Sequence, residues 1–345
     1  MQRTISNSNN AMFVPLPQYA SPADKDSRYC KSLYIDNELD LKKEIDNLLA
    51  HNDEFIYRGV YDASYKMFSS SQRMWFLDDQ RMLRLGYTNY YDTIECLIKL
   101  AASQPDVQQY IQQNNLPFNE FLILAMLQHF GSPSPMLDFS NSVLKGLFFA
   151  VDNMPDWTDK GTNNLDDYVS LYYISRNIDW VNCTVQKVMQ NAAADIERLI
   201  TDTHQKDPAL QIQTDEVKDN IQYLKYHQFR PEFGNIFFLP VGGPAAGRVK
   251  IDIPVENFHC DYYIVNDRLI SQEGLFIFNN TKDIPLVEVM NSVCHIQYFH
   301  CINIRKHLVP EIISRYLQPN GITHNSVYCI GNTVSDQLQL VFNGI

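Results

Sequence analysis

The chain has 345 residues, of which 45% are hydrophobic and 12% aromatic, so it can bury a substantial core and lacks the composition of a disordered protein. Its formal net charge of -12 excludes a protein that coats nucleic acid or anionic membrane by bulk electrostatics. No apolar run long enough for a membrane span or a signal peptide occurs, which argues against both. Seven cysteines without a CxxC pair favour a reducing compartment, so we expect a cytoplasmic protein.

The first half of the chain alternates polar stretches with apolar periodic segments. Residues 1–35 are rich in Ser, Asn and Pro and predict an extended arm. Apolar residues at helical spacing and one buried-type segment that ends at Gly131 then predict helices. The expected elements are a helix over 38–50, a strand over 55–57, and helices over 93–102 and 121–130.

The second half reads as strands around a polar insert. A proline-stiffened loop over 132–139 and a helix over 142–152 are expected first. Aromatic and β-branched content then predicts strands at 168–174, 235–241, 275–278 and 295–304. Residues 182–228 are polar and helix-permissive, so we expect an inserted helical segment. No linker divides the chain, which favours one domain over 1–345.

Arg58 follows a short apolar strand in the sequence FIYRG. Strand alternation puts Arg58 on the same face as Ile56 and opposite to Tyr57. An arginine there either pairs with a core carboxylate and holds the fold, or presents a planar fork to a phosphate or carboxylate. Gly59 would let a ligand or another backbone approach closely. The tripeptide alone favours the structural role.

Three further places concentrate reactive side chains. His129 ends the buried helix, where carbonyl groups favour an imidazolium. Asp138 and Ser140 precede the next helix, and Ser140 or Asn141 is the expected N-cap, beside amides that also suit a pyrophosphate. In NDRLISQEGLF, Arg268, Gln272 and Glu273 precede a glycine turn and a strand. Each set also has a purely structural interpretation.

Two other chemistries are disfavoured. Cys294, His295, His300 and Cys301 have no standard zinc spacing, and strand alternation would send them to different faces, so no metal is expected. His129, Asp138 and Ser140 have the residue types of a hydrolytic triad, but no GxSxG elbow surrounds Ser140.

Together these stretches resemble the FRG domain family, over about residues 35–330. The resemblance rests on five matched motifs, with one departure, because Ser134-Pro135 stands where the family often has Thr-Arg. The matches are Tyr57-Arg58-Gly59, Gln128-His129-Phe130-Gly131, Leu137-Asp138-Phe139-Ser140, Arg268 with Gln272, Gly274 and Phe276, and Gly321-Ile322.

The family is similar to the ADP-ribosyltransferase fold. That resemblance implies an α+β domain in which split small β-sheets form a cleft for NAD, flanked by helices. It assigns binding to Tyr57, Arg58, Gly59, Asp138, Phe139, Ser140 and Arg268, and catalysis to Gln272, Glu273 and His129. Arg58 would face the diphosphate, Tyr57 or Phe139 would stack on nicotinamide, and Glu273 or Gln272 would face the ribose hydroxyls, where cleavage builds positive charge.

Three functions therefore stay open. The chain is an NAD-consuming transferase or glycohydrolase, or a non-catalytic module that binds a nucleotide, or an interaction protein whose 182–228 insert recruits a protein partner.

Overall fold

The computed structural model describes most of the chain outside the predicted insert. The described residues are 16–76, 90–113, 120–152, 154–157, 164–175, 236–239, 250–255, 258–263, 271–279, 281–294, 297–329 and 340.

Seven strands form one mixed sheet in the order β1-β9-β4-β2-β3-β8-β5. β1 and β9 are parallel, and the other neighbouring strands are antiparallel. The strands are β1 (Lys31–Ile35), β2 (Phe55–Val60), β3 (Met136–Ser140), β4 (Tyr168–Ser175), β5 (Ile236–Leu239), β8 (Gly274–Asn279) and β9 (His300–Arg305). A separate antiparallel pair joins β6 (Lys250–Val255) to β7 (Phe258–Tyr263).

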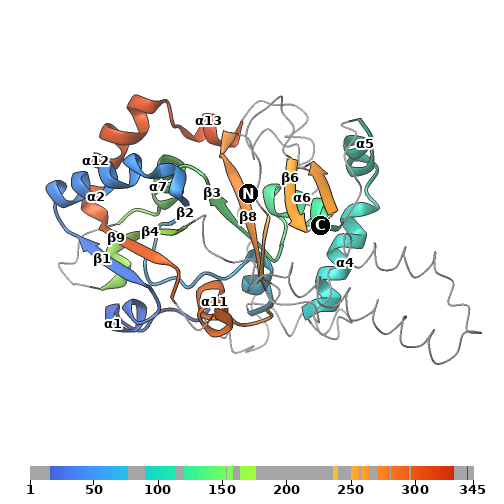
Figure 1. The fold of residues 1–345 in the computed structure, drawn as a ribbon, viewed down its shortest axis with the longest axis horizontal. Coiled ribbons are helices and arrows are strands. Elements are labelled where there is room, and N and C mark those ends of the chain that lie inside the picture. Colours follow the sequence, from blue (N-terminus) through green and yellow to red (C-terminus); the bar gives the residue numbers. More distant parts are fainter. Residues whose placement is uncertain are drawn as a thin grey trace, which may run out of the picture.

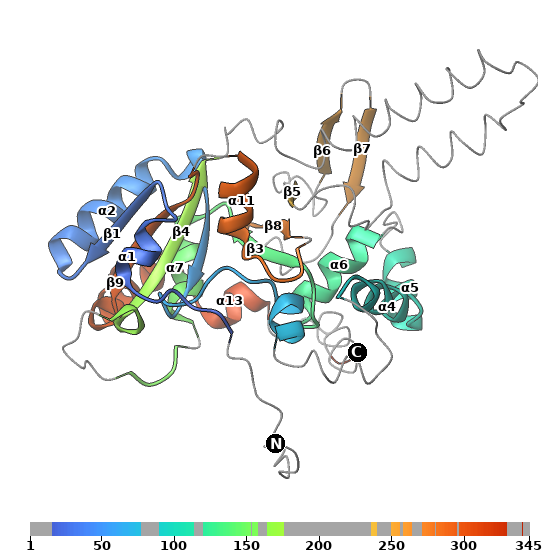
Figure 2. The same cartoon turned by 90° about the horizontal axis from the view of Figure 1, so that it is seen from below.

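Helices cover both faces of the larger sheet, as the α+β prediction requires (Figure 1). The helices are α1 (Pro22–Asp26), α2 (Glu38–Ala50), α4 (Tyr90–Ala102), α5 (Pro105–Gln113), α6 (Glu120–His129), α7 (Val143–Val151), α11 (Leu286–Cys294), α12 (Val309–Ile312) and α13 (His324–Tyr328). α2, α7 and α12 lie on one face, and α1 and α11 on the other. α4, α5 and α6 gather beyond the β3–β8 side of the sheet, far from β1 (Figure 2).

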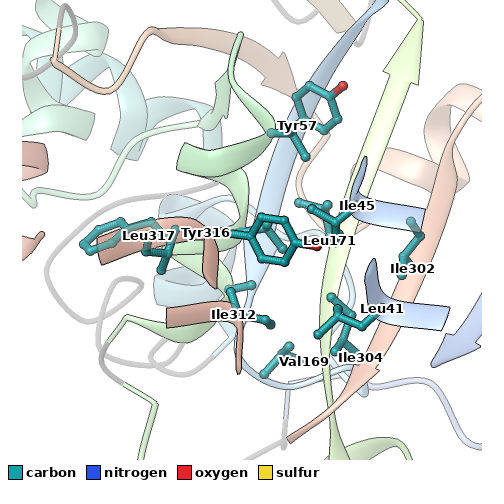
Figure 3. Packing of buried hydrophobic residues seen from close by; sticks show 14 of the residues in the cluster. Leu41, Ile45, Tyr57, Val169, Leu171, Ile302, Ile304, Ile312, Tyr316 and Leu317 are labelled. Carbon is teal, nitrogen blue, oxygen red and sulfur yellow. The ribbon is translucent and has the colours of Figure 1, made fainter. Parts of the chain in front are cut away.

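Each face has its own hydrophobic core. Leu41 and Ile45 of α2 pack with Leu171 of β4 and Ile312 of α12, and Tyr57 of β2 belongs to the same cluster (Figure 3). On the opposite face, Ile56 of β2 packs in a second cluster with residues of β3, β4 and α11. Successive side chains of β2 therefore point to opposite cores, as strand alternation predicts, and Arg58 shares the face of Ile56.

Several sequence-based elements are confirmed. α2 has the predicted bounds, because Asn37 caps its first turn and its buried residues recur at helical spacing. α4, α6, α7, β2 and β4 fall where they were expected. Gly131 adopts a φ of 83° directly after α6, and the amide of Ser132 bonds to the carbonyl of Leu127 at 2.9 Å, as in a glycine-terminated helix end.

Three expected segments differ from the structure. The arm expected over 1–35 is not extended throughout, because α1 lies in it and residues 31–35 form β1, the edge strand that pairs with β9. Met136 to Phe139, expected in a loop, belong to β3, which lies between β2 and β8 and is mostly buried. The strand expected over 295–304 begins at His300.

The backbone pairing between neighbouring strands of this sheet is shortest between β2 and β3. The two strands share a single register pair, Tyr57 with Ser140, whereas β2 pairs with β4 over six residues. Helix α7 crosses this place so closely that a Cβ on Gly59 would lie 2.0 Å from the carbonyl oxygen of Gly146. Beyond Tyr57, β2 and β3 diverge, and this point is called the seam below.

Candidate functional site

Arg58 spans the seam. It is the first residue of β2 after the Tyr57–Ser140 pair, and its Nη1 donates to the main-chain oxygen of Asp138 at 2.5 Å. The guanidinium also lies 6.0 Å from the ring centre of Phe139. Its Nε is buried and has no hydrogen-bond partner among the described residues. Arg58 thus bridges β2 and β3 at a point where their backbones no longer pair. Its Nε–H group is left to donate a further hydrogen bond.

Asp138 supplies the negative charge beside Arg58. Its Oδ2 accepts a hydrogen bond of 2.5 Å from Nε2 of Gln128, whose Oε1 accepts from the hydroxyl of Ser70 at 3.1 Å. Burial raises the pKa of Asp138, while the charge of Arg58, the bond from Gln128 and the charge of Arg73 oppose that rise. The carboxyl group is therefore held in place by neutral and cationic neighbours.

Arg73 is a second cation at this site, and no sequence motif points to it. It lies in the helical residues 70–76 within electrostatic reach of Asp138 and Arg58. The pKa of Arg73 is lowered by partial removal of its head group from water, against the charge of Asp138, although the side chain as a whole is exposed. The carboxylate of Asp138 thus lies within electrostatic reach of two guanidinium groups, and the three groups together carry an excess positive charge in an acidic protein.

The helical residues 70–76 are anchored at Ser134. The amide of Ser134 donates to the hydroxyl of Ser70 at 2.9 Å, and the amide of Ser71 donates to the carbonyl of Ser134 at 3.1 Å. Ser134 is fully buried. These bonds fix the start of the helical turn from which Arg73 projects.

His129 and Phe139 lie near this cluster. The ring of His129 contacts that of Phe276 edge-on, with centres 4.9 Å apart, and Phe276 pairs with Asp138 across β3 and β8. Phe139 is buried in the core that α11 covers. The structure therefore brings the predicted residues Arg58, Asp138, His129 and Phe139 around β3.

Tyr57 and Gly59 are held in the core. The ring of Tyr57 is fully buried in the cluster with α2 and α7, so a ligand would reach it only by displacing core side chains. Gly59 is packed against the backbone of α7. A glycine at this position could admit either a ligand or another segment of backbone. In this structure it admits the backbone of α7.

Ser140 and Gln272 meet at the start of α7. The hydroxyl of Ser140 donates to the main-chain oxygen of Gln272 at 2.7 Å and accepts from the amide of Ser142 at 3.0 Å. Both residues are buried. Tyr57, Ser140 and Gly274 lie in one row across β2, β3 and β8, so three of the sequence motifs do converge in space.

The N-cap expectation for α7 is wrong. Ser142 is the N-cap residue and makes no side-chain cap, while Asn52, which follows α2, caps the helix from outside. Its Oδ1 accepts from the amide of Val143 at 2.7 Å, and its Nδ2 donates to the carbonyl of Asn141 at 3.1 Å. An interaction between residues 91 positions apart leaves no local signal in the sequence.

Glu273 is exposed and has a left-handed backbone, with φ of 47°. Its carbonyl accepts from the amide of Asn141 at 2.8 Å, and its charge opposes the lowering of the Lys145 pKa that burial causes. A non-glycine residue in this conformation is unusual and stores strain at the turn before β8. The charge of Glu273 thus lies within electrostatic reach of Lys145 on α7.

Arg268 and the 182–228 segment lie outside the described residues. In the described part of the chain, no helix combines the length and apolar character needed to cross a bilayer. Nor do the described residues place three or more His, Cys, Asp or Glu side chains where they would hold a metal ion.

Comparison with known proteins supports the FRG family. The FRG domain model matches residues 53–159, a shorter stretch than the motifs suggested. The matched stretch includes Arg58, Arg73, Gln128, Asp138 and Ser140. No curated protein and no solved structure is significantly similar to the chain.

Proposed function

We propose that this FRG-domain protein binds NAD or a related nucleotide, in an arrangement like that of ADP-ribosyltransferases, with the diphosphate at Arg58 and Arg73. The observation that supports the proposal is that Arg58 at the seam and the nearby Arg73 are both within electrostatic reach of a single carboxylate, that of Asp138. A diphosphate satisfies both their charge and their planar donor geometry.

A purely structural role accounts for only part of this arrangement. To hold β2 and β3 together, one arginine and one acceptor are enough. The hydrogen bond from Arg58 to the carbonyl of Asp138 supplies both. It does not require Arg73, whose side chain is exposed. Burying the Arg58 head group is costly, since burial lowers its pKa and the nearby charge of Arg73 adds to that effect. An anionic ligand would relieve the repulsion between the two arginines.

Cleavage of the nicotinamide–ribose bond is the further step that the family resemblance suggests. It needs an anion near the ribose. Gln272 is buried and accepts a hydrogen bond from Ser140 through its main-chain oxygen, and the carboxylate of Glu273 has the charge of Lys145 within electrostatic reach. Because neither side chain supplies an unpaired anion to the ribose, these placements favour nucleotide binding without cleavage. Nicotinamide release by the purified protein distinguishes the two.

Calorimetric titration with NAD and ADP-ribose tests the binding proposal. Binding of either nucleotide to the unaltered protein is expected, and Arg73→Ala should weaken it by about tenfold or more, because a charge-assisted contact contributes about 1.5–3 kcal/mol. The matched control is Arg315→Ala, since Arg315 is an exposed arginine paired with Glu311 on the same helical turn. Absence of nucleotide binding, or equal effects of both substitutions, would refute the proposal.

Asp138→Asn offers a complementary measurement. The substitution keeps the size of the side chain and removes the negative charge that partly neutralises the two arginines. We expect the affinity for an anion to rise about threefold or more. A fall in affinity would show instead that the carboxylate itself contacts the ligand.

A further inference from the structure

The carboxylate of Asp138 lies within electrostatic reach of Arg58, but a different side chain holds it. Nη1 of Arg58 donates to the main-chain oxygen of Asp138, and this is the only hydrogen bond of that guanidinium within the described part of the chain. A partly buried guanidinium beside a carboxylate commonly forms an ion pair with it, often through two parallel hydrogen bonds. The different arrangement found here needs a physical cause.

Gln128 of α6 is that cause. Its Nε2 donates to Oδ2 of Asp138 at 2.5 Å, a short bond of the kind made to a charged acceptor. The opposite orientation of the amide would set its oxygen against a carboxylate oxygen. On the other side, the hydroxyl of Ser70 lies 3.1 Å from both Oε1 of Gln128 and the carbonyl of Ser134, and can donate to either. The carboxylate is therefore directed toward α6.

The direction of this carboxylate decides how many donors of Arg58 remain for a ligand. A carboxylate bonded to Gln128 offsets the charge of Arg58 through space, whereas one bonded to the guanidinium would also occupy its N–H groups. Burial raises the pKa of Asp138, while the charge of Arg58 and the bond from Gln128 oppose that rise, so Gln128 also favours the ionised form. The side chain of Arg58 is half-buried, which leaves part of it in contact with solvent.

From this geometry we infer that Gln128 is a positioning residue, which holds the carboxylate of Asp138 away from Arg58 and so leaves the guanidinium available to an anionic ligand. The inference rests on the proposed function and deepens it, because it assigns control of the affinity to a neutral residue that acts through Asp138. Without the amide, the carboxylate would turn toward Arg58 and compete with the ligand as an internal anion.

The alternative is that Gln128 only fastens α6 to β3 and to the helical residues 70–76. In that case, removal of its amide would loosen the site whatever residue stands at position 138. If Gln128 instead acts through the charge of Asp138, removal of the amide has little effect once that charge is gone. A double-mutant comparison at positions 128 and 138 therefore separates the two roles.

The experiment titrates full-length variants with inorganic pyrophosphate in a calorimeter, and urea midpoints check that each variant is folded. Gln128→Met keeps the length of the side chain without the donor, and should weaken pyrophosphate binding about fivefold or more. Combined with Asp138→Asn, the same substitution should change the affinity less than about twofold. The matched control is Gln108→Met, since Gln108 is an exposed glutamine on α5 that donates to the carbonyl of Ala102, and it should leave the affinity unchanged.

Three results would overturn the inference. Gln128→Met could bind pyrophosphate as tightly as the unaltered protein, or it could weaken binding equally with and without Asp138→Asn; in both cases the proposed function would still stand. If Gln128→Met does not fold, Gln128→Leu repeats the comparison, and failure of both to fold would show that Gln128 serves the fold and not the ligand. If the unaltered protein binds neither pyrophosphate nor NAD, the proposed function fails, and this inference fails with it.

Discussion

Lys25 is a fully buried lysine that donates hydrogen bonds to three neutral oxygens. Its Nζ donates to the carbonyl of Ala63 at 2.8 Å, to the hydroxyl of Ser170 at 2.7 Å and to Oδ1 of Asn303 at 2.7 Å. It also lies 5.0 Å from the ring centre of Tyr172. Burial lowers the pKa of Lys25. We predict that this ammonium group joins the N-terminal segment to β4 and β9, and that Lys25→Met destabilises the protein.

The magnitude follows from what methionine leaves behind. Its stem fills a similar volume, and the hydroxyl of Ser170 still donates to Asn303 at 2.7 Å, so the principal acceptor that loses its donor is the carbonyl of Ala63. A buried acceptor without a donor costs about 1–3 kcal/mol, and the lost contact with the Tyr172 ring adds about 1 kcal/mol. Release of a desolvated charge offsets part of this. We expect a net loss of ~1–3 kcal/mol.

Urea unfolding, followed by tryptophan fluorescence and far-UV circular dichroism, measures this loss. The control is Lys42→Met, because Lys42 is an exposed lysine that pairs with Asp46 on α2, and such pairs contribute at most about 1 kcal/mol. A Lys25→Met protein as stable as the unaltered one would refute the reasoning, since the desolvation cost of the charge would then equal all that its hydrogen bonds contribute.

Three further predictions concern the frame around the site. Gly59→Ala should lower the free energy of unfolding by about 3 kcal/mol or more, because the new Cβ would lie 2.0 Å from the backbone of α7, and a urea titration measures this. Asn52→Ala should lower thermal stability by about 1–2 kcal/mol while Ser142→Ala changes it little, and a reversed order would contradict the external cap. Burial lowers the pKa of His300 below 6.5, so its contribution to stability is present above pH 6.5 and lost as the pH falls; His300→Phe should flatten that decline in urea midpoints measured between pH 7 and pH 5.

Local patterns predicted the helices and the motif positions well. α2 is defined by its N-cap and its apolar period, both visible within about four turns. Arg58, Asp138 and Ser140 were selected by motif, and β3 does bring them together. The features that could be predicted are therefore those determined by residues close together in the sequence.

Features that depend on distant segments could not be predicted. β1 was missed because its partner β9 lies some 270 residues further along the chain. β3 could not be predicted for two reasons. Prolines precede it, and its burial on both faces removes the polar–apolar alternation that marks an exposed strand. Arg73 stands in a polar stretch without a motif, and it comes near the site only because residues 70–76 dock on Ser134. Lys25 has the residue type least expected in a core.

The seam has a mechanical consequence for the larger sheet. Neighbouring strands normally resist sliding past each other because many backbone hydrogen bonds join them. Here one register pair and one arginine join the group β1-β9-β4-β2 to the group β3-β8-β5. The two halves of the sheet are thus coupled mainly by side chains and by α7, which lies across both. We expect amide protons of β2 and β3 to exchange with solvent sooner than those of β4 and β9, and an anion bound between the arginines to slow that exchange.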